Sequence, residues 1–281
     1  MRPATRLRAA PATVFMPFDG SPQALWTFPV ARTICRLMEG SLHLVLPAET
    51  RAAREGLTLL EDPAADATWH EMTGDLAIGI SQLASFNPEA FIVIPAHGAT
   101  RPESGLDRGP EEILRRAPCP VLLVRPEMEF KEWTLRRILI FQDGTAAAAR
   151  ALCPVARLAE KSGAEVLILH VTSERTPEAL EPGAMIVPAY VDQPQHEWPS
   201  WMDAFLGRIR HLCRMSPDVA LRFHWTRGEP GREIVRLALR GAADLVTLLR
   251  SRSPDAVRGQ IFRQVLRDAP CPILVLPALS R

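Results

Sequence analysis

Two turns of the chain carry an aspartate, a glycine and a hydroxyl residue in that order, each between an apolar run and a helix-forming run. Glycine gives such a turn a permissive backbone, and serine or threonine is a preferred N-cap residue of a helix. The pattern therefore predicts two strand-to-helix turns, each with a carboxylate beside the helix cap. The two triplets are Asp19-Gly20-Ser21 and Asp143-Gly144-Thr145.

No catalytic or metal-binding pattern accompanies these turns. His97 stands beside Gly98 in a predicted loop, but the spacing assigns no serine or cysteine nucleophile with an activating base to it. The stretch His196-Glu197-Trp198 lacks the H-E-x-x-H spacing of a metalloprotease helix. The sequence therefore favours a binding protein over an enzyme and predicts no metal site.

The five cysteines are odd in number, widely spaced and without a C-x-x-C pair. This spacing argues against a disulfide framework or a zinc site and favours a reducing, cytoplasmic compartment. Cys119 and Cys271 each open an apolar run, where cysteine behaves as a small buried hydrophobic residue. We expect these two thiols to be structural.

The composition excludes some classes of partner. A formal net charge of +1 gives no general field for nucleic acid or an anionic membrane. No apolar run approaches the roughly 20 residues that cross a bilayer, and the arginine-containing start lacks the apolar core of a secretory signal. A protein without nucleic-acid or membrane partners is expected.

Three sequence features, which we call landmarks, occur in the same order in each half of the chain, and they indicate which elements position the two turns. The sequence RRAPCPVLLVRP (115–126) returns as LRDAPCPILVLP (266–277). Between each turn and its APCP sequence lies a glycine-acid pair that precedes an amphipathic helix and a buried strand, within 72–98 and 225–250. Three landmarks in the same order, twice, indicate a duplicated structural unit.

The landmarks predict two domains, residues 1–128 and 129–281. From the aspartate to the glycine-acid pair there are 55 positions in the first copy and 85 in the second, whereas the next interval is 45 and 43. The extra length therefore falls in the second copy, near 172–197. Its prolines predict a long irregular insert outside the core.

Each domain reads as alternating strands and helices. Apolar runs without alternation, such as FIVIP, are typical of parallel strands covered by helices on both faces. Five such units with right-handed crossovers predict a doubly wound, Rossmann-like α/β sheet per domain. The predicted strands are 13–18, 41–46, 67–73, 91–95, 120–124, 136–142, 164–171, 219–226, 243–249 and 272–276. The predicted helices are 22–39, 49–60, 75–86, 109–116, 145–162, 198–214, 231–241 and 258–267.

These repeated landmarks resemble those of a tandem universal stress protein, over nearly the whole chain. The resemblance implies an adenine nucleotide alpha hydrolase-like fold, with a five-stranded parallel sheet in order 3-2-1-4-5 in each domain. It also implies a cytoplasmic stress-response protein, and many members bind ATP while others do not. The usual two-fold pair of the family would form within the tandem chain as an intramolecular pseudo-dimer, and further dimerisation stays open.

ATP-binding members carry Gly-x-x-Gly, nine residues and then Gly-Ser or Gly-Thr after the fourth strand. Glycines let backbone N–H groups approach phosphate, and a helix N-terminus favours the anion. In the first domain Gly98 stands at the second glycine, but Pro95 replaces the first. Gly109 stands one residue after the position of the third motif glycine, and it is followed by Pro110 instead of serine or threonine. The resemblance therefore leaves either partial nucleotide binding or an empty remnant site there.

The second domain departs further from the motif. Leu249 and Arg252 stand at the paired glycines, and only Gly259 remains. Arg250, Arg252 and Arg258 either bind an anion through their side chains or form a solvated basic loop.

Two hypotheses follow. The first is a nucleotide-responsive binding protein, with ATP bound weakly and in the first domain. The second is an ATP-independent stress scaffold or chaperone-like protein with an unidentified protein partner. Slow ATP hydrolysis comes third, because no general base or Mg²⁺ ligand set is recognisable. The candidate binding residues are Asp19, Gly20, Ser21, His97, Gly98, Asp143, Gly144, Thr145 and Gly259.

Overall fold

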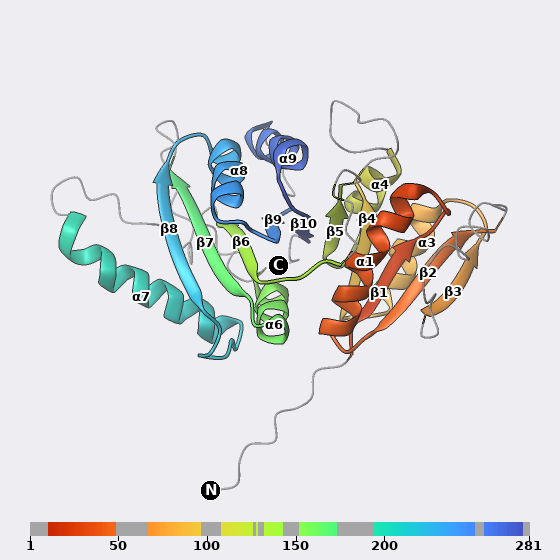
Figure 1. The fold of residues 1–281 in the computed structure, drawn as a ribbon, viewed down its shortest axis with the longest axis horizontal. Helices are drawn as coiled ribbons and strands as arrows, with labels where there is room; N and C mark the ends of the chain where they lie inside the picture. The colour runs from red at the N-terminus through yellow and green to blue at the C-terminus, as the bar shows by residue number, and fades with distance from the viewer. Residues whose placement is uncertain are drawn as a thin grey trace, which may run out of the picture.

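One continuous ten-stranded sheet forms the centre of the computed structural model (Figure 1). In order across the sheet its strands are β3 (Ala67–Met72), β2 (Ser41–Pro47), β1 (Thr13–Pro17), β4 (Ala90–Pro95), β5 (Val121–Val124), β10 (Ile273–Leu276), β9 (Leu245–Leu249), β6 (Arg137–Gln142), β7 (Glu165–Thr172) and β8 (Leu221–Arg227). The structure describes residues 11–48, 67–96, 108–125, 128, 132–142, 152–172, 194–250 and 256–277, without the side chains of 194–202 and 256–258.

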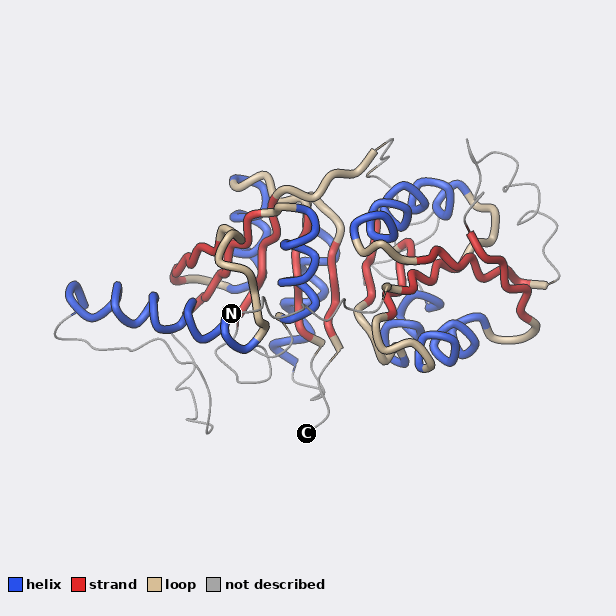
Figure 2. Tube along the Cα trace, turned by 90° about the horizontal axis from the view of Figure 1, so that it is seen from below, coloured by secondary structure: helices blue, strands red, loops and turns tan. Residues whose placement is uncertain are grey.

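Helices cover both faces of this sheet (Figure 2). On one face are α1 (Pro22–Leu37), α6 (Cys153–Ser162) and α7 (Pro194–Leu212). On the other are α3 (Leu76–Ser85), α4 (Arg108–Arg116), α8 (Pro230–Arg240) and α9 (Ala256–Asp268). Alternate residues of each inner strand enter one or the other of two apolar cores, which explains why these strands are apolar throughout.

The predicted strand order is confirmed within each half. The first half reads β3-β2-β1-β4-β5 and the second reads β8-β7-β6-β9-β10, with parallel pairing between neighbours. The prediction of two separate five-stranded sheets is wrong, because β5 and β10 pair antiparallel and join the halves. Each of these strands would otherwise present unpaired N–H and C=O groups at an edge.

The central pairing has a symmetric register. Leu122 of β5 pairs with Leu274 of β10, and these two leucines occupy the same place in the repeated APCP sequences. The flanking pairs are Val121 with Val275 and Leu123 with Ile273. Equivalent segments therefore meet each other, as they do at a two-fold interface.

The segment between β5 and β6 also binds the halves together. Trp133 is buried, and its Nε1–H donates to the backbone carbonyl of Asp244 at 3.2 Å, while Thr33 Oγ1 donates to the carbonyl of Trp133 at 3.2 Å. The Asp244 carboxylate accepts the backbone N–H groups of Arg136 and Arg137 at 2.8 and 2.9 Å. The two halves are thus in contact, as predicted from the short charged junction.

Two arginines complete that contact by crossing between the halves. Arg125, after β5, donates to the carbonyl of Arg267 in α9 at 2.7 Å. Arg250, after β9, donates to the carbonyls of Leu114 and Arg115 in α4. Each guanidinium therefore meets carbonyls near a helix C-terminus, where a positive charge is favourable.

The glycine-acid landmark forms the same structure in both halves. Gly74 and Gly228 have φ of +86° and +149°, which favours glycine. The acid that follows caps the next helix. Asp75 accepts two N–H groups of α3 at 2.8 and 3.1 Å, and Glu229 accepts two of α8 at 3.1 and 2.8 Å.

A disulfide joins Cys153, at the start of α6, to Cys213, just after α7. The cysteine spacing, which argued against a disulfide framework, did not predict this bond. The two residues are 60 positions apart, but α6 and α7 lie on the same face and bring their Cα atoms to 4.6 Å. Cys119 and Cys271 are buried as predicted, and burial raises the pKa of each thiol to about 12.

Some predicted elements lie outside the described residues, among them the helix near 49–60 and most of the 172–197 insert. Residues 194–197 of that insert form the first turn of α7, which starts four positions earlier than predicted. Pro194 suits such a start, because the first turn needs no backbone N–H. None of the described helices is long and apolar enough to cross a membrane.

Candidate functional site

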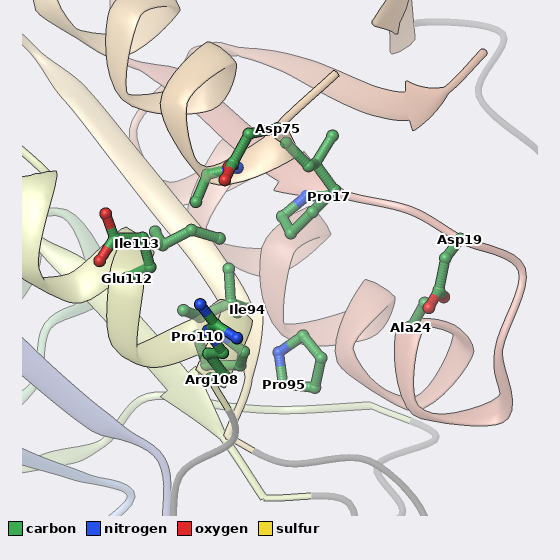
Figure 3. Close-up of a pocket in the computed structure, with 13 residues that line it drawn as sticks. Pro17, Asp19, Ala24, Asp75, Ile94, Pro95, Arg108, Pro110, Glu112 and Ile113 are labelled. Carbon is green, nitrogen blue, oxygen red and sulfur yellow. The ribbon is translucent and has the colours of Figure 1, made fainter. Parts of the chain in front are cut away.

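A pocket of about 620 Å³ lies at the carboxyl ends of β1 and β4 (Figure 3). The strand order reverses between these two strands, and doubly wound sheets bind ligands at such a switch point. The polar lining residues are Asp19, Asp75, Arg108 and Glu112. The other lining residues are Pro17, Ala24, Leu76, Ala77, Ile94, Pro95, Gly109, Pro110 and Ile113.

The turn from β1 to α1 positions Asp19. Phe18 is fully buried and anchors the end of the strand, and Gly20 follows with φ of +78°. Ser21 then caps α1, since its Oγ accepts the Ala24 N–H at 3.2 Å. The Asp19 carboxylate accepts the Ser21 N–H at 2.9 Å and remains exposed. The turn thus presents a hydrogen-bonded carboxylate to the pocket.

Helix α4 supplies two further charged residues of the pocket, Arg108 and Glu112, on the side opposite Asp19 (Figure 3). Glu112 accepts hydrogen bonds from Arg115 and Arg116, and these bonds lower its pKa to about 2. Its charge is therefore matched by two guanidinium groups of its own helix. Arg108, the first residue of α4, is exposed and makes no ion pair with any described residue.

The pocket therefore combines apolar walls with a few charged groups, as small-molecule sites commonly do. Asp75 is engaged in capping α3, and Glu112 is engaged by arginines. Asp19 and Arg108 remain as the carboxylate and the cation most available to a ligand. Within the described residues there is no group of three or more His, Cys, Asp or Glu that could hold a metal ion.

The predicted site residues have different outcomes. Asp19 lines the pocket, while Gly20 and Ser21 form the turn that holds it. Gly259 lies in α9, half-buried, and a Cβ there would meet only the Arg263 side chain, at 3.5 Å. The remaining candidates lie outside the described residues, namely His97, Gly98, Asp143, Gly144 and Thr145.

Three polar residues of the pocket were not predicted as site residues. Asp75 belongs to the repeated glycine-acid landmark, which ends a strand at the same edge of the sheet as Asp19 and so carried a usable signal. No sequence signal indicated Arg108 and Glu112, because charged residues on a short helix usually lie on its solvated face. Pro95, Gly109 and Pro110, where the sequence departs from the phosphate motif, do line the pocket.

Comparison with known proteins agrees with this architecture. The sequence profile described as universal stress protein family matches residues 134–277. Over 95% of this chain and 96% of its own, a universal stress protein from Archaeoglobus fulgidus DSM 4304 has a similar fold, with a TM-score of 0.61 and 18% identity. A functionally unknown protein from Pseudomonas aeruginosa PAO1 gives 0.61 and 17%, over 96% and 93% of the two chains.

At these identities the solved structures show the fold alone. None of the curated proteins compared matches the chain. The profile match, however, spans just over half of the sequence and includes the turn, glycine-acid and APCP landmarks of the second half. The chain belongs to the universal stress protein family.

Proposed function

We propose that this universal stress protein acts by binding a small molecule, and that the pocket of its first half takes an adenine nucleotide. The observation that carries the proposal is the position of the pocket at the β1–β4 switch point, with Asp19 and Arg108 on opposite sides. Its volume lies within the range of roughly 300–1,000 Å³ that small-molecule sites occupy.

The two sides of the pocket suit the two ends of a nucleotide. Asp19 can accept hydrogen bonds from the adenosine end of a nucleotide, which is the end where the family resemblance places this aspartate. Arg108 stands at the N-terminus of α4, where both its guanidinium and the helix dipole favour phosphate. Pro95 and Pro110 have no backbone N–H, so fewer donors face a phosphate than in a glycine-rich loop, and we expect weak binding.

We further propose that the protein is not an enzyme. Asp75 already caps α3, and the bonds from Arg115 and Arg116 lower the pKa of Glu112 to about 2, so neither carboxylate is arranged to act as a general base.

An ATP-independent scaffold is the second candidate, and two exposed apolar side chains favour it. Helix α3 contains no charged residue, and Ile78 on it is 38% exposed. Phe86, immediately after the helix, is 82% exposed. No charged residue stands between these two in the sequence, and apolar side chains that gather on a surface are typical of protein interaction sites.

Calorimetric titration of the full chain with ATP tests the nucleotide proposal. Gly109 lines the pocket, and a Cβ there meets nothing within 4 Å, so Gly109→Leu should fill the pocket without straining α4. Gly259→Leu is the matched control in α9. We expect the first variant to lose ATP binding and the second to keep whatever binding the unaltered protein has. Absence of binding by the unaltered protein would favour the scaffold.

A further inference from the structure

The disulfide between Cys153 and Cys213 joins opposite ends of two helices. Cys153 is the first residue of α6, whereas Cys213 directly follows α7. The backbone N–H of Cys213 donates to the Ile209 carbonyl in the last turn of α7, at 3.0 Å. Both cysteines are half-buried, so the bond is within reach of a small thiol. The two sulfur atoms therefore lie in different electrostatic surroundings at an accessible site.

The start of α6 favours a thiolate at Cys153. Its N-cap residue, Leu152, makes no side-chain capping bond, and no acidic residue stands in the first turn. The positive end of the helix dipole is therefore not matched there by a carboxylate, and cysteine thiolates are stabilised at helix N-termini. Cys213 has the opposite situation, because the carbonyl groups at the C-terminus of α7 disfavour a negative charge.

The three free cysteines offer no comparable site. Cys119 and Cys271 are buried, and burial raises the pKa of each thiol to about 12, so neither forms a thiolate near neutral pH. Cys35 in α1 is half-buried, and its Sγ donates to the Gly40 carbonyl at 3.1 Å, which favours the protonated thiol. The bonded pair is therefore the better candidate for thiol chemistry.

We propose that the bond between Cys153 and Cys213 is redox-active, and that a dithiol reductant opens it in the folded protein with Cys153 as the leaving group. One thiolate of the reductant attacks Cys213 Sγ, the bond between the two cysteines breaks, and Cys153 departs with the electron pair as a thiolate. The second thiol of the reductant then loses its proton and displaces Cys213, which takes up a proton. Two electrons pass to the protein, and the reductant leaves as a disulfide.

Opening the bond releases the end of α7 from α6. The connection after α7 follows one side of α6, where the Ser216 N–H donates to the Glu160 carboxylate. Glu160 is seven positions after Cys153 and so lies on the same face of the helix. Lys161 of α6 pairs with Glu39 of the first half at 2.6 Å. Reduction therefore leaves α6 in place against the first half, while the end of α7 loses its covalent attachment and becomes more mobile.

Alkylation of the full chain tests the proposal. The folded protein is treated with dithiothreitol without urea, quenched with iodoacetamide in denaturant, and weighed by mass spectrometry. Reduction should add two alkyl groups, one at each bonded cysteine. Cys35→Ser, which removes a half-buried thiol outside the pair, should lower the count by one and keep the gain of two. If the gain appears only at urea concentrations that unfold the chain, the bond is structural and the proposal is overturned.

Further measurements identify the leaving group and the released segment. The thiol of Cys153 in Cys213→Ser should carry about tenfold more thiolate at pH 7 than that of Cys213 in Cys153→Ser, as measured by the pH dependence of alkylation. Circular dichroism establishes that both variants are folded. In the unaltered protein, reduction should speed amide hydrogen exchange in 209–216 by at least about tenfold and leave β6 unchanged. The opposite order of reactivity overturns the role of Cys153, and unchanged exchange overturns the release of α7.

Discussion

Thr247 in β9 occupies the position that Val93 occupies in β4. The residues before them, Val246 and Ile92, make equivalent hydrogen bonds. Each donates its backbone N–H to the carbonyl of the second proline in the APCP sequence of its own half, at 3.0 Å. Both side chains are buried on the face covered by α1, α6 and α7. The Thr247 hydroxyl has no hydrogen-bond partner among the described residues. One repeat thus has a polar group where the other has a methyl group.

Replacing Thr247 by valine should therefore stabilise the protein, by about 1 kcal/mol, since an unsatisfied buried hydroxyl is removed and the shape is kept. The reverse change, Val93→Thr, should destabilise it by about 1–2 kcal/mol. Urea denaturation measures both. If Thr247→Val lowers the free energy of unfolding, the hydroxyl must have a partner in solution.

The disulfide between Cys153 and Cys213 predicts a definite count of reactive thiols. Denatured without a reductant, the protein should take up three alkyl groups, because three of the five cysteines are free; after reduction it should take up five. Mass spectrometry reads the count. Five groups without a reductant would show that the bond does not form.

Breaking the same bond should lower stability. Cys153→Ser removes a cross-link between α6 and α7, at a cost of about 2–4 kcal/mol in the free energy of unfolding under non-reducing conditions. In dithiothreitol the variant and the unaltered protein should become nearly equal in urea. A difference that persists in the reductant would mean that the serine itself, rather than the lost bond, destabilises the fold.

His43 predicts a fall in stability on the acid side of neutrality. Its pKa is lowered in the folded state by burial and by the charge of His70, so the unfolded chain binds the proton more readily. The stabilisation is present above the unfolded pKa of about 6.5 and is lost as the pH falls through the lower folded value. The melting temperature between pH 8 and pH 5 should fall less steeply in His43→Gln than in the unaltered protein. Equal slopes would contradict the assignment to His43.

Asp244→Ala should weaken the attachment of the segment between β5 and β6 to the second half. Its carboxylate accepts the backbone N–H groups of Arg136 and Arg137, and their loss should cost about 1–3 kcal/mol. Asp268→Ala, which removes an exposed pair with Arg267, should change stability by less than about 1 kcal/mol. Urea denaturation of both variants makes the comparison, and equal effects would mean that Asp244 has no special role at the junction.

The sequence predicted the strands of both halves to within about two residues because apolar runs and repeated turns both pointed to them. It did not predict the joined sheet, since nothing in an apolar run such as VLLV says which edge will meet β5. The disulfide was missed for a similar reason: linear spacing carries no information on which helices share a face.

The site was predicted in part. Asp19 could be found because a strand-to-helix turn has a recognisable composition, and Asp75 could have been found from the repeated landmark. Arg108 and Glu112 enter the pocket only through the placement of α4 against β4, which depends on packing across the whole half. Periodicity identifies such a helix but does not tell which of its charged residues faces a ligand.

The antiparallel junction of β5 with β10 gives one chain two places of the same topological kind. The switch point between β1 and β4 in the first half has its counterpart between β6 and β9 in the second. Because different residues build the two places, one can change what it binds while the other keeps its function, and both halves keep their place in the shared sheet.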